Sequence, residues 1–130
     1  MDLSSKTAVV TGAGQGVGLG IASAMSKKGA KVAMLGRTFS KVKNESSKLN
    51  EAGFETLALE CDVKDPDSIS NAQGEIKKIF GPVNVLINNA QEVPLGSILD
   101  VTDEAINAGW ESGPLATFRL MKLFLSLIHI

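Results

Sequence analysis

The chain has 130 residues, of which 44% are hydrophobic and 21% are charged, and its formal net charge is −1. These values are typical of one globular domain and argue against a disordered chain. Basic residues are spread along the sequence, so neither nucleic-acid binding nor membrane-surface binding is indicated. The lone cysteine, Cys61, excludes an internal disulfide and fits a reducing compartment. Because the sequence shows neither a secretory signal nor an apolar run of roughly 18–20 residues, we expect a cytoplasmic protein without a membrane helix.

Strands and helices are predicted to alternate in the first half of the chain. Two short β-branched runs, residues 6–12 and 31–35, have the pattern of buried strands. Between them, residues 13–30 carry small and apolar side chains at helical spacing and close on two lysines and a glycine, which predicts a helix with a glycine stop. A polar, lysine-rich surface helix is expected over residues 40–52.

The alternation continues in the second half. Residues 54–63 alternate as a third strand, and residues 65–81 open with Asp-Pro, an N-cap followed by proline at the first helical position. The unbroken apolar run over residues 83–90 predicts a fourth strand. A loop over residues 92–102 then leads to residues 102–124, which hold one or two helices that a Gly-Pro pair interrupts.

This order of elements decides the fold class. The crossovers between strands are long enough for parallel pairing, and continuously apolar strands indicate a sheet that is buried on both faces. The sequence contains no internal repeat and no linker. We therefore predict an α/β fold, a Rossmann-type doubly wound parallel sheet of about four strands with flanking helices.

A glycine-rich turn, "VVTGAGQGVGLG", joins the first predicted strand to the first predicted helix. Gly12 permits the tight turn, Gly16 lets a pyrophosphate approach the backbone, and Gly18 lets the helix pack closely on the strand. The free N–H groups and the positive dipole end of the helix then face the phosphate. A glycine motif alone is a weak signal, but the strand–turn–helix context favours a dinucleotide site over a purely structural turn.

With these residues the sequence resembles the short-chain dehydrogenase/reductase family. The turn matches the family pattern TGxxxGxG from Thr11 onward, "CDV" at 61–63 matches the acidic position that contacts adenine, and "NNA" at 88–90 matches the NNAG motif that ends the fourth strand. The resemblance runs from residue 5 to about residue 124. It implies that the cofactor is bound by Gly12, Gln15, Gly16, Val17, Gly18, Arg37, Thr38, Asp62, Val63, Asn89 and Ala90.

The residue after the second predicted strand indicates which dinucleotide is preferred. Sites that select NAD place an Asp or Glu there to bond the ribose hydroxyls. In "MLGRT" that position is Arg37, whose guanidinium can hold a 2′-phosphate, and Thr38 can add a hydroxyl. The pattern favours NADP, with NAD as the alternative; an arginine that only caps the strand end is the structural alternative.

No catalytic residue is assigned. The resemblance implies a Tyr, a Lys four residues after it, and a Ser, all beyond the fifth strand and past the matched region, and the chain contains no tyrosine. A further family residue, an Asn that helps to position a water, aligns with Gly113, and Gln91 replaces the glycine of NNAG. We expect no metal site, because His129 is the only histidine and has no ligand cluster around it.

The resemblance therefore implies the cofactor-binding half of an NADP-dependent short-chain oxidoreductase that is inactive alone. Its full-length parent would exchange a hydride with a small carbonyl or alcohol substrate and would be a homo-oligomer. The alternative is a complete, non-catalytic NADP-binding or regulatory module.

The last residues suggest that the chain is truncated. We expect a cofactor-binding domain over residues 1–124 and a non-native tail over residues 125–130. The tail, "LSLIHI", matches the translation of a transposon-end sequencing adapter, ctg-tct-ctt-ata-cac-atc, although a natural apolar helix end is the alternative. We also expect Cys61 to be a packed, reduced strand residue and Trp110 to anchor a helix on the core.

Overall fold

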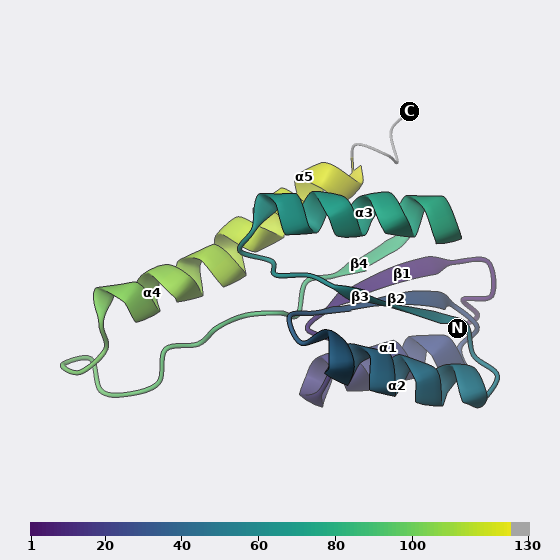
Figure 1. Ribbon diagram of the computed structural model, residues 1–130, viewed down its shortest axis with the longest axis horizontal. Coiled ribbons are helices and arrows are strands. Elements are labelled where there is room, and N and C mark those ends of the chain that lie inside the picture. Colours follow the sequence, from purple (N-terminus) through teal and green to yellow (C-terminus); the bar gives the residue numbers. More distant parts are fainter. Residues whose placement is uncertain (126–130) are drawn as a thin grey trace.

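The computed structural model describes residues 1–125, and its centre is one parallel sheet (Figure 1). The strands are β1 (Thr7–Thr11), β2 (Lys31–Gly36), β3 (Thr56–Glu60) and β4 (Val85–Ile87). Their order across the sheet is β3-β2-β1-β4, and every neighbouring pair is parallel. The chain therefore winds outward from β1 to β3 and then crosses back to place β4 on the other side of β1. Such a reversal opens a crevice at the carboxyl ends of the two strands that flank it.

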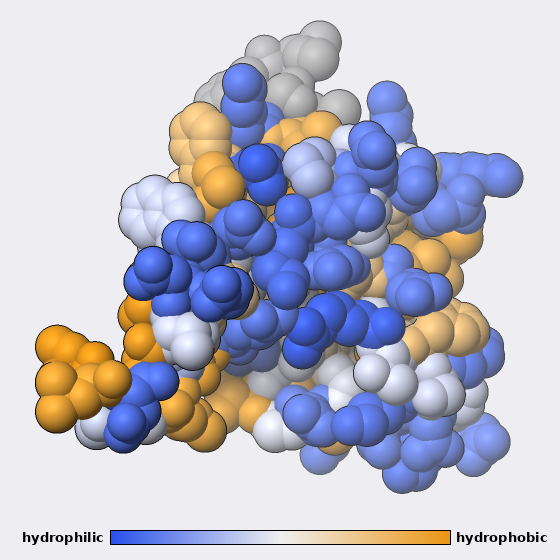
Figure 2. Space-filling model, turned by 60° about the vertical axis from the view of Figure 1, so that its left-hand side comes forward, coloured by the Kyte–Doolittle hydropathy of each residue, from blue (hydrophilic) through white to orange (hydrophobic). Residues whose placement is uncertain are grey.

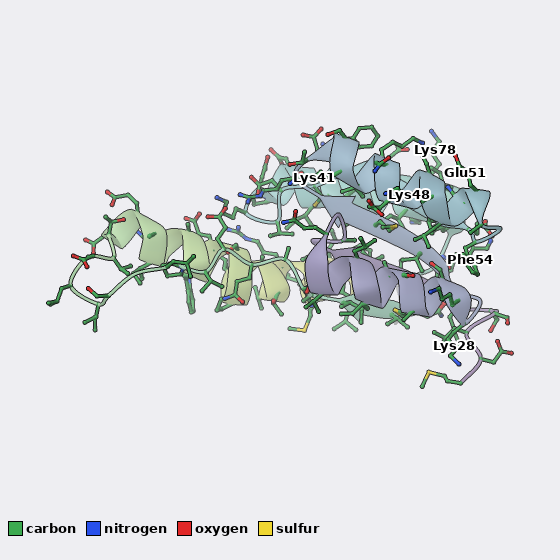
Figure 3. The ribbon with its side chains drawn as sticks, turned by 90° about the horizontal axis from the view of Figure 1, so that it is seen from below. Lys28, Lys41, Lys48, Glu51, Phe54 and Lys78 are labelled. Carbon is green, nitrogen blue, oxygen red and sulfur yellow. The ribbon has the colours of Figure 1, made fainter. Side chains whose placement is uncertain are left out.

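Helices cover both faces of the sheet. In Figure 1, α3 (Pro66–Phe80) and α5 (Ala116–Leu125) lie above it, and α1 (Gly16–Lys27) and α2 (Phe39–Glu51) lie below. Figure 3, seen from below, shows α1 and α2 side by side on the same face. The predicted α/β fold, a Rossmann-type sheet of four strands with flanking helices, is confirmed.

The two cores follow from the strand period of two. Alternate residues of a strand point to opposite faces, so Val10 packs with Met34 against the layer of α1 and α2, whereas Val9 packs with Leu35 against the layer of α3 and α5. The five residues of β1 are all buried, as the continuous apolar pattern predicts for a central strand. The edge strands depart from that expectation, because β4 is only half-buried and β3 is buried at Thr56 alone.

β4 is also shorter than predicted, since it ends at Ile87 rather than at residue 90. Beyond that point side chains replace the ladder of backbone bonds. The hydroxyl oxygen of Thr11 accepts the N–H groups of Asn89 and Ala90, each at 3.0 Å. The Asn89 side-chain amide donates to the carbonyl oxygens of Thr11, at 3.1 Å, and of Gly12, at 3.2 Å. These bonds join the end of β1 to the segment after β4.

The helix-terminus signals of the sequence are confirmed. Asp65 caps α3 by accepting the N–H of Asp67 at 2.9 Å, and proline follows it at the start of the helix. The glycines that close α1 and α3 have positive φ angles, +96° at Gly29 and +78° at Gly81.

The Gly-Pro pair does not separate two helices. α4 (Asp103–Trp110) continues through a π-helical turn, Glu111–Leu115, directly into α5. A proline lacks the N–H of a helical bond and clashes with the carbonyl four residues earlier. A wide turn inside the helix absorbs both effects, so the interruption takes the form of a π turn.

α4 and the segment before it project from the rest of the molecule (Figure 1). None of the α4 residues is buried, and Trp110 is 60% exposed, so the expectation that Trp110 anchors the helix on the core is wrong. Leu95, Ile98 and Leu99 of the preceding segment are almost fully exposed. Figure 2 shows a hydrophobic group at the lower left, where this segment projects.

Of the predicted tail, Leu125 ends α5, and residues 126–130, with His129, lie outside the described residues. No helix within residues 1–125 is both long and apolar enough to cross a lipid bilayer.

Gly18 lies where α1 packs against the end of β1. A Cβ atom placed on it would lie 2.2 Å from the carbonyl oxygen of Gly12 and 2.5 Å from the amide nitrogen of Asn89. The predicted close packing of helix on strand at Gly18 is therefore confirmed. Gly20 is an exposed glycine of the same helix, and a Cβ atom placed on it would have no atom within 4 Å.

We expect Gly18→Ala to destabilise the fold by about 1–3 kcal/mol, because the added methyl group overlaps backbone that cannot move without breaking the Asn89 bonds. Gly20→Ala is the matched control in the same helix, and it should stabilise by about 0.5–1 kcal/mol through helix propensity alone. Urea unfolding followed by circular dichroism measures both. Equal stabilisation by the two variants would show that α1 does not approach β1 this closely.

Candidate functional site

A cavity of about 390 Å³ lies at the carboxyl ends of the strands, within the size range of small-molecule sites. It is lined by nine of the eleven residues predicted to bind a cofactor: Gly12, Gln15, Gly16, Arg37, Thr38, Asp62, Val63, Asn89 and Ala90. The other two, Val17 and Gly18, belong to α1 beside the glycine turn. Segments from Gly12 to Ser112 thus contribute to one pocket.

The glycine turn forms one wall of this pocket. Gly12 and Gly16 have φ angles of +64° and +57°, a left-handed conformation that favours glycine. This confirms the predicted tight turn at Gly12. A Cβ atom on Gly16 would meet nothing within 4 Å, so the backbone there faces open space.

The amino terminus of α1 opens beside Gly16. Its N-cap residue, Gln15, makes no side-chain cap bond, and the first turn of the helix contains no acidic residue. The N–H groups of the first turn and the positive end of the helix dipole are therefore available to an anion. The geometry has the elements of a phosphate cradle.

Lys41 adds a cation to the same wall, and sequence reasoning missed it. It lies near the start of α2, as Figure 3 shows, and its ammonium group donates to the side-chain oxygen of Gln15 at 3.2 Å. The sequence did contain a sign that this end of α2 is positively charged, because its first turn has no acidic residue although helix dipoles favour one there.

The segment after β3 forms another wall of the pocket. The Asp62 N–H donates to the Ser68 hydroxyl at 2.9 Å, and the Asp62 carboxylate accepts the backbone N–H of Lys64 at 3.0 Å. Val63 is buried between them. Both bonds hold the segment in a fixed turn, so that Asp62 and Val63 line the pocket together.

Cys61 borders this wall as a buried free thiol. Burial raises the pKa of Cys61 to about 11, which keeps the thiol protonated and weakly nucleophilic at neutral pH. The prediction of a packed residue is confirmed, but Cys61 lies directly after β3 rather than in the strand.

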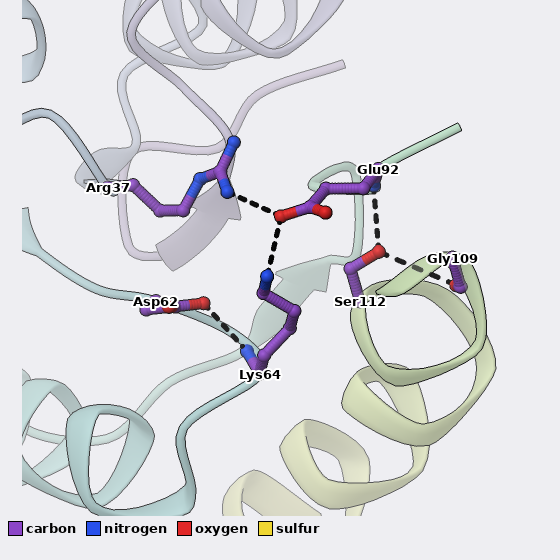
Figure 4. A network of polar contacts seen from close by, with 6 residues as sticks. All are labelled: Arg37, Asp62, Lys64, Glu92, Gly109 and Ser112. Atoms are coloured by element: carbon purple, nitrogen blue, oxygen red, sulfur yellow. Dashed lines mark hydrogen bonds and ion pairs between the residues drawn. The ribbon is translucent and has the colours of Figure 1, made fainter. Parts of the chain in front are cut away.

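Three charged side chains meet across the pocket (Figure 4). The Glu92 carboxylate oxygen Oε1 accepts from Arg37 Nη1 at 2.5 Å and from Lys64 Nζ at 2.8 Å. The hydrogen bond from Lys64 is the main reason that the pKa of Glu92 lies below its ordinary value, and the same bond raises the pKa of Lys64. Sequence reasoning identified Arg37 but missed Lys64 and Glu92, since no spacing rule relates residues from the ends of three different strands.

Ser112 holds the backbone of Glu92. Its hydroxyl oxygen accepts the Glu92 N–H at 2.7 Å, and it is oriented toward the carbonyl oxygen of Gly109 at 3.5 Å. Ser112 is buried and belongs to the π-helical turn. The wide turn therefore fixes the start of the projecting segment against the pocket.

The two residues that depart from the family pattern, Gln91 in the NNAG motif and Gly113 at the Asn position, lie next to each other. A Cβ atom on Gly113 would lie 2.9 Å from the Gln91 amide nitrogen. The Gln91 side chain therefore occupies the space that a side chain at position 113 would need. An amide group is present at this place, but it comes from the segment after β4 rather than from the helix.

Comparison with known proteins agrees with this geometry. The family model of the short chain dehydrogenases matches residues 6–129. Oxidoreductase UcpA of Escherichia coli strain K12 is 36% identical over 102 residues, which are 78% of this chain and 38% of that protein.

Two solved structures share the fold closely. L-sorbose reductase from Gluconobacter frateurii, complexed with NADPH and L-sorbose, has a TM-score of 0.90 and 29% identity, covering 97% of this chain and 48% of that one. An alcohol dehydrogenase from Thermococcus sibiricus, complexed with 5-hydroxy-NADP, has a TM-score of 0.89 and 27% identity, covering 95% of this chain and 53% of that one.

The chain spans 38% of UcpA and about half of the two solved structures. The matched part contains the glycine turn, the segments after β3 and β4, and the helices that enclose them. On the family match and the geometry together, the chain belongs to the short-chain dehydrogenase family.

Proposed function

We propose that the pocket binds NADP(H) and that the chain is the cofactor-binding part, residues 1–124, of a short-chain oxidoreductase. The glycine turn and the amino terminus of α1, with Gln15 and Val17, would hold the pyrophosphate. Asp62 and Val63 would contact the adenine, and Asn89 and Ala90 would line the side next to β4. Gly18 acts indirectly, by letting α1 approach the strand.

The observation that carries the proposal is the open cradle at Gly16 in the same pocket as Arg37. Gly16 leaves room for a phosphate beside free helix N–H groups. Arg37 and Thr38 follow β2 and line the same cavity, at the position where a carboxylate would select NAD. With Lys41 and Lys64 the lining contains three cations against the two carboxylates of Asp62 and Glu92, a formal charge of +1.

The relatives support the chemistry proposed for the full-length protein. NADP(H), when bound, gives or takes a hydride, and the two solved relatives are described with NADPH and with an NADP derivative. We propose that a longer parent protein exchanges this hydride with a small carbonyl or alcohol compound. The 130 residues contain no tyrosine, the residue that the family uses as general acid and base. We therefore expect no turnover of carbonyl substrates by this chain alone.

Arg37→Asp should reverse the cofactor preference from NADPH to NADH. The change removes a charge-assisted contact to the 2′-phosphate, worth about 1.5–3 kcal/mol, and places a carboxylate where ribose hydroxyls can donate to it. Titrations that follow the fluorescence of NADPH and NADH measure both affinities. Lys43→Asp makes the same change in charge on the exposed surface of α2 and should leave the preference unchanged. Equal affinity of the unmodified chain for the two dinucleotides would contradict the proposed role of Arg37.

A chain that ends at Phe124 should bind NADPH as tightly as residues 1–130 do. Phe124 is buried in the core, and the residues that line the pocket all precede position 113. A chain that ends at Leu123 is the matched control. Loss of the Phe124 ring should lower its free energy of unfolding by up to about 3 kcal/mol. Weaker binding by the chain ending at Phe124, with its melting temperature unchanged, would show that the last six residues contribute to the site.

A further inference from the structure

One carboxylate oxygen in the pocket receives two cations. Arg37 comes from the end of β2, Lys64 from the segment after β3, and Glu92 from the segment after β4. Both cationic groups reach the same atom, Glu92 Oε1, at 2.5 and 2.8 Å (Figure 4). The point where the two cations converge is therefore a place where the protein binds an anionic oxygen.

Glu92 is held in this position from its backbone as well. The Glu92 N–H donates to the Ser112 hydroxyl at 2.7 Å, and Ser112 is buried in the π-helical turn. The Glu92 side chain itself keeps 30% of its surface exposed, and that of Arg37 keeps 60%. The backbone is thus anchored while the side chain remains partly exposed, an arrangement that lets the carboxylate leave without moving the segment that bears it.

A 2′-phosphate would bind to the same two cations, Arg37 and Lys64. Phosphate and carboxylate oxygens both accept charge-assisted bonds from guanidinium and ammonium groups, and they compete for the same donors. A dinucleotide with a 2′-hydroxyl brings no additional anion to this point and does not compete with Glu92.

We propose that Glu92 is a specificity-determining residue of the pocket, which occupies the anion position between Arg37 and Lys64 and must be displaced by the 2′-phosphate of NADP(H) but not by NAD(H). The inference rests on the proposed dinucleotide site. It assigns Lys64 as the second cation for the phosphate. The preference for NADP(H) then depends on how much more strongly Arg37 and Lys64 bind the phosphate than they bind the Glu92 carboxylate.

The test is Glu92→Gln in residues 1–130, which keeps the side-chain shape and the backbone bond to Ser112 but removes the charge. The variant should bind NADPH about three- to tenfold more tightly, the range that two partly exposed ion pairs supply. Its affinity for NADH should change by less than about twofold. The ratio of the two affinities is the readout, because a loss of folded protein lowers both equally.

Glu45→Gln is the matched control. Glu45 pairs with Lys48 on α2 at 2.9 Å, so this variant also breaks a lysine–glutamate ion pair and removes one negative charge. Glu45 does not line the pocket. The ratio of NADPH to NADH affinity should stay at the value of the unmodified chain.

A double-mutant cycle with Lys64→Gln isolates the competition. In the unmodified chain, Lys64→Gln removes a phosphate contact but also weakens the hold on Glu92, so the two effects partly cancel. In the Glu92→Gln background only the phosphate contact is removed. Lys64→Gln should therefore weaken NADPH binding more in that background than in the unmodified chain.

The outcomes separate this inference from the function on which it rests. If the unmodified chain binds NADPH and Glu92→Gln leaves the affinity ratio unchanged or lowers it, Glu92 does not compete and the inference fails while the dinucleotide site stands. Equal effects of Lys64→Gln in both backgrounds also overturn it. If neither the unmodified chain nor Glu92→Gln binds either dinucleotide, the proposed function and this inference fail together.

Discussion

The bonds between Thr11 and the segment after β4 are the constraint on which the pocket depends. Two backbone N–H groups donate to the Thr11 hydroxyl, and Asn89 returns two bonds to the carbonyls of Thr11 and Gly12. These bonds fix the distance between β1 and the residues after β4 at the place where the strand order reverses. Gly18 then lets α1 settle against the same junction. The glycine turn, the helix terminus and the start of the projecting segment are all positioned from this point.

Charge in the pocket is arranged around that rigid junction. The glycine turn offers dipoles and N–H groups, which cannot rearrange, whereas Arg37, Lys64 and Glu92 are long side chains that are at least partly exposed. Under the proposed function, an anionic ligand would meet both a fixed cradle and an ion pair that it can displace. Fixed groups favour any pyrophosphate, and an exchangeable pair distinguishes between ligands by the charge they bring.

Most of the fold could be predicted because its signals are local. Apolar runs, the Asp-Pro start of α3 and the glycines that close helices depend on neighbouring residues, and the structure has these elements with shifts of a few residues. Trp110 and the short β4 were misjudged because their surroundings come from elsewhere. The hydroxyl of Thr11 replaces the ladder past Ile87, and the exposure of Trp110 follows from the projection of α4.

The same distinction applies to the site. The glycine turn and Arg37 occupy family positions that a single sequence displays, so the sequence could predict that they lie together in the pocket. Lys64, Glu92 and Ser112 meet only when the segments after β3 and β4 converge with the π-helical turn. The residues next to each of them in the sequence give no sign of this contact. In the sequence, Gln91 and Gly113 are two independent departures from the family pattern. Their contact in the structure shows that the Gln91 side chain fills the space that a side chain at position 113 would need.

The helical order of α4 depends on the elements to which it is joined. An isolated helix of eight residues is too short to hold its shape in water, where roughly 12–15 residues are needed. α4 buries none of its residues, so side-by-side packing does not supply what its length lacks. Its order depends on its continuity with α5 through the wide turn at Pro114 and on the Thr102 hydroxyl, which accepts the Ala105 N–H at 3.2 Å. Fraying should therefore begin at Asp103 and stop at Ser112, which is the first residue with a buried side chain in the continuous helix from α4 to α5.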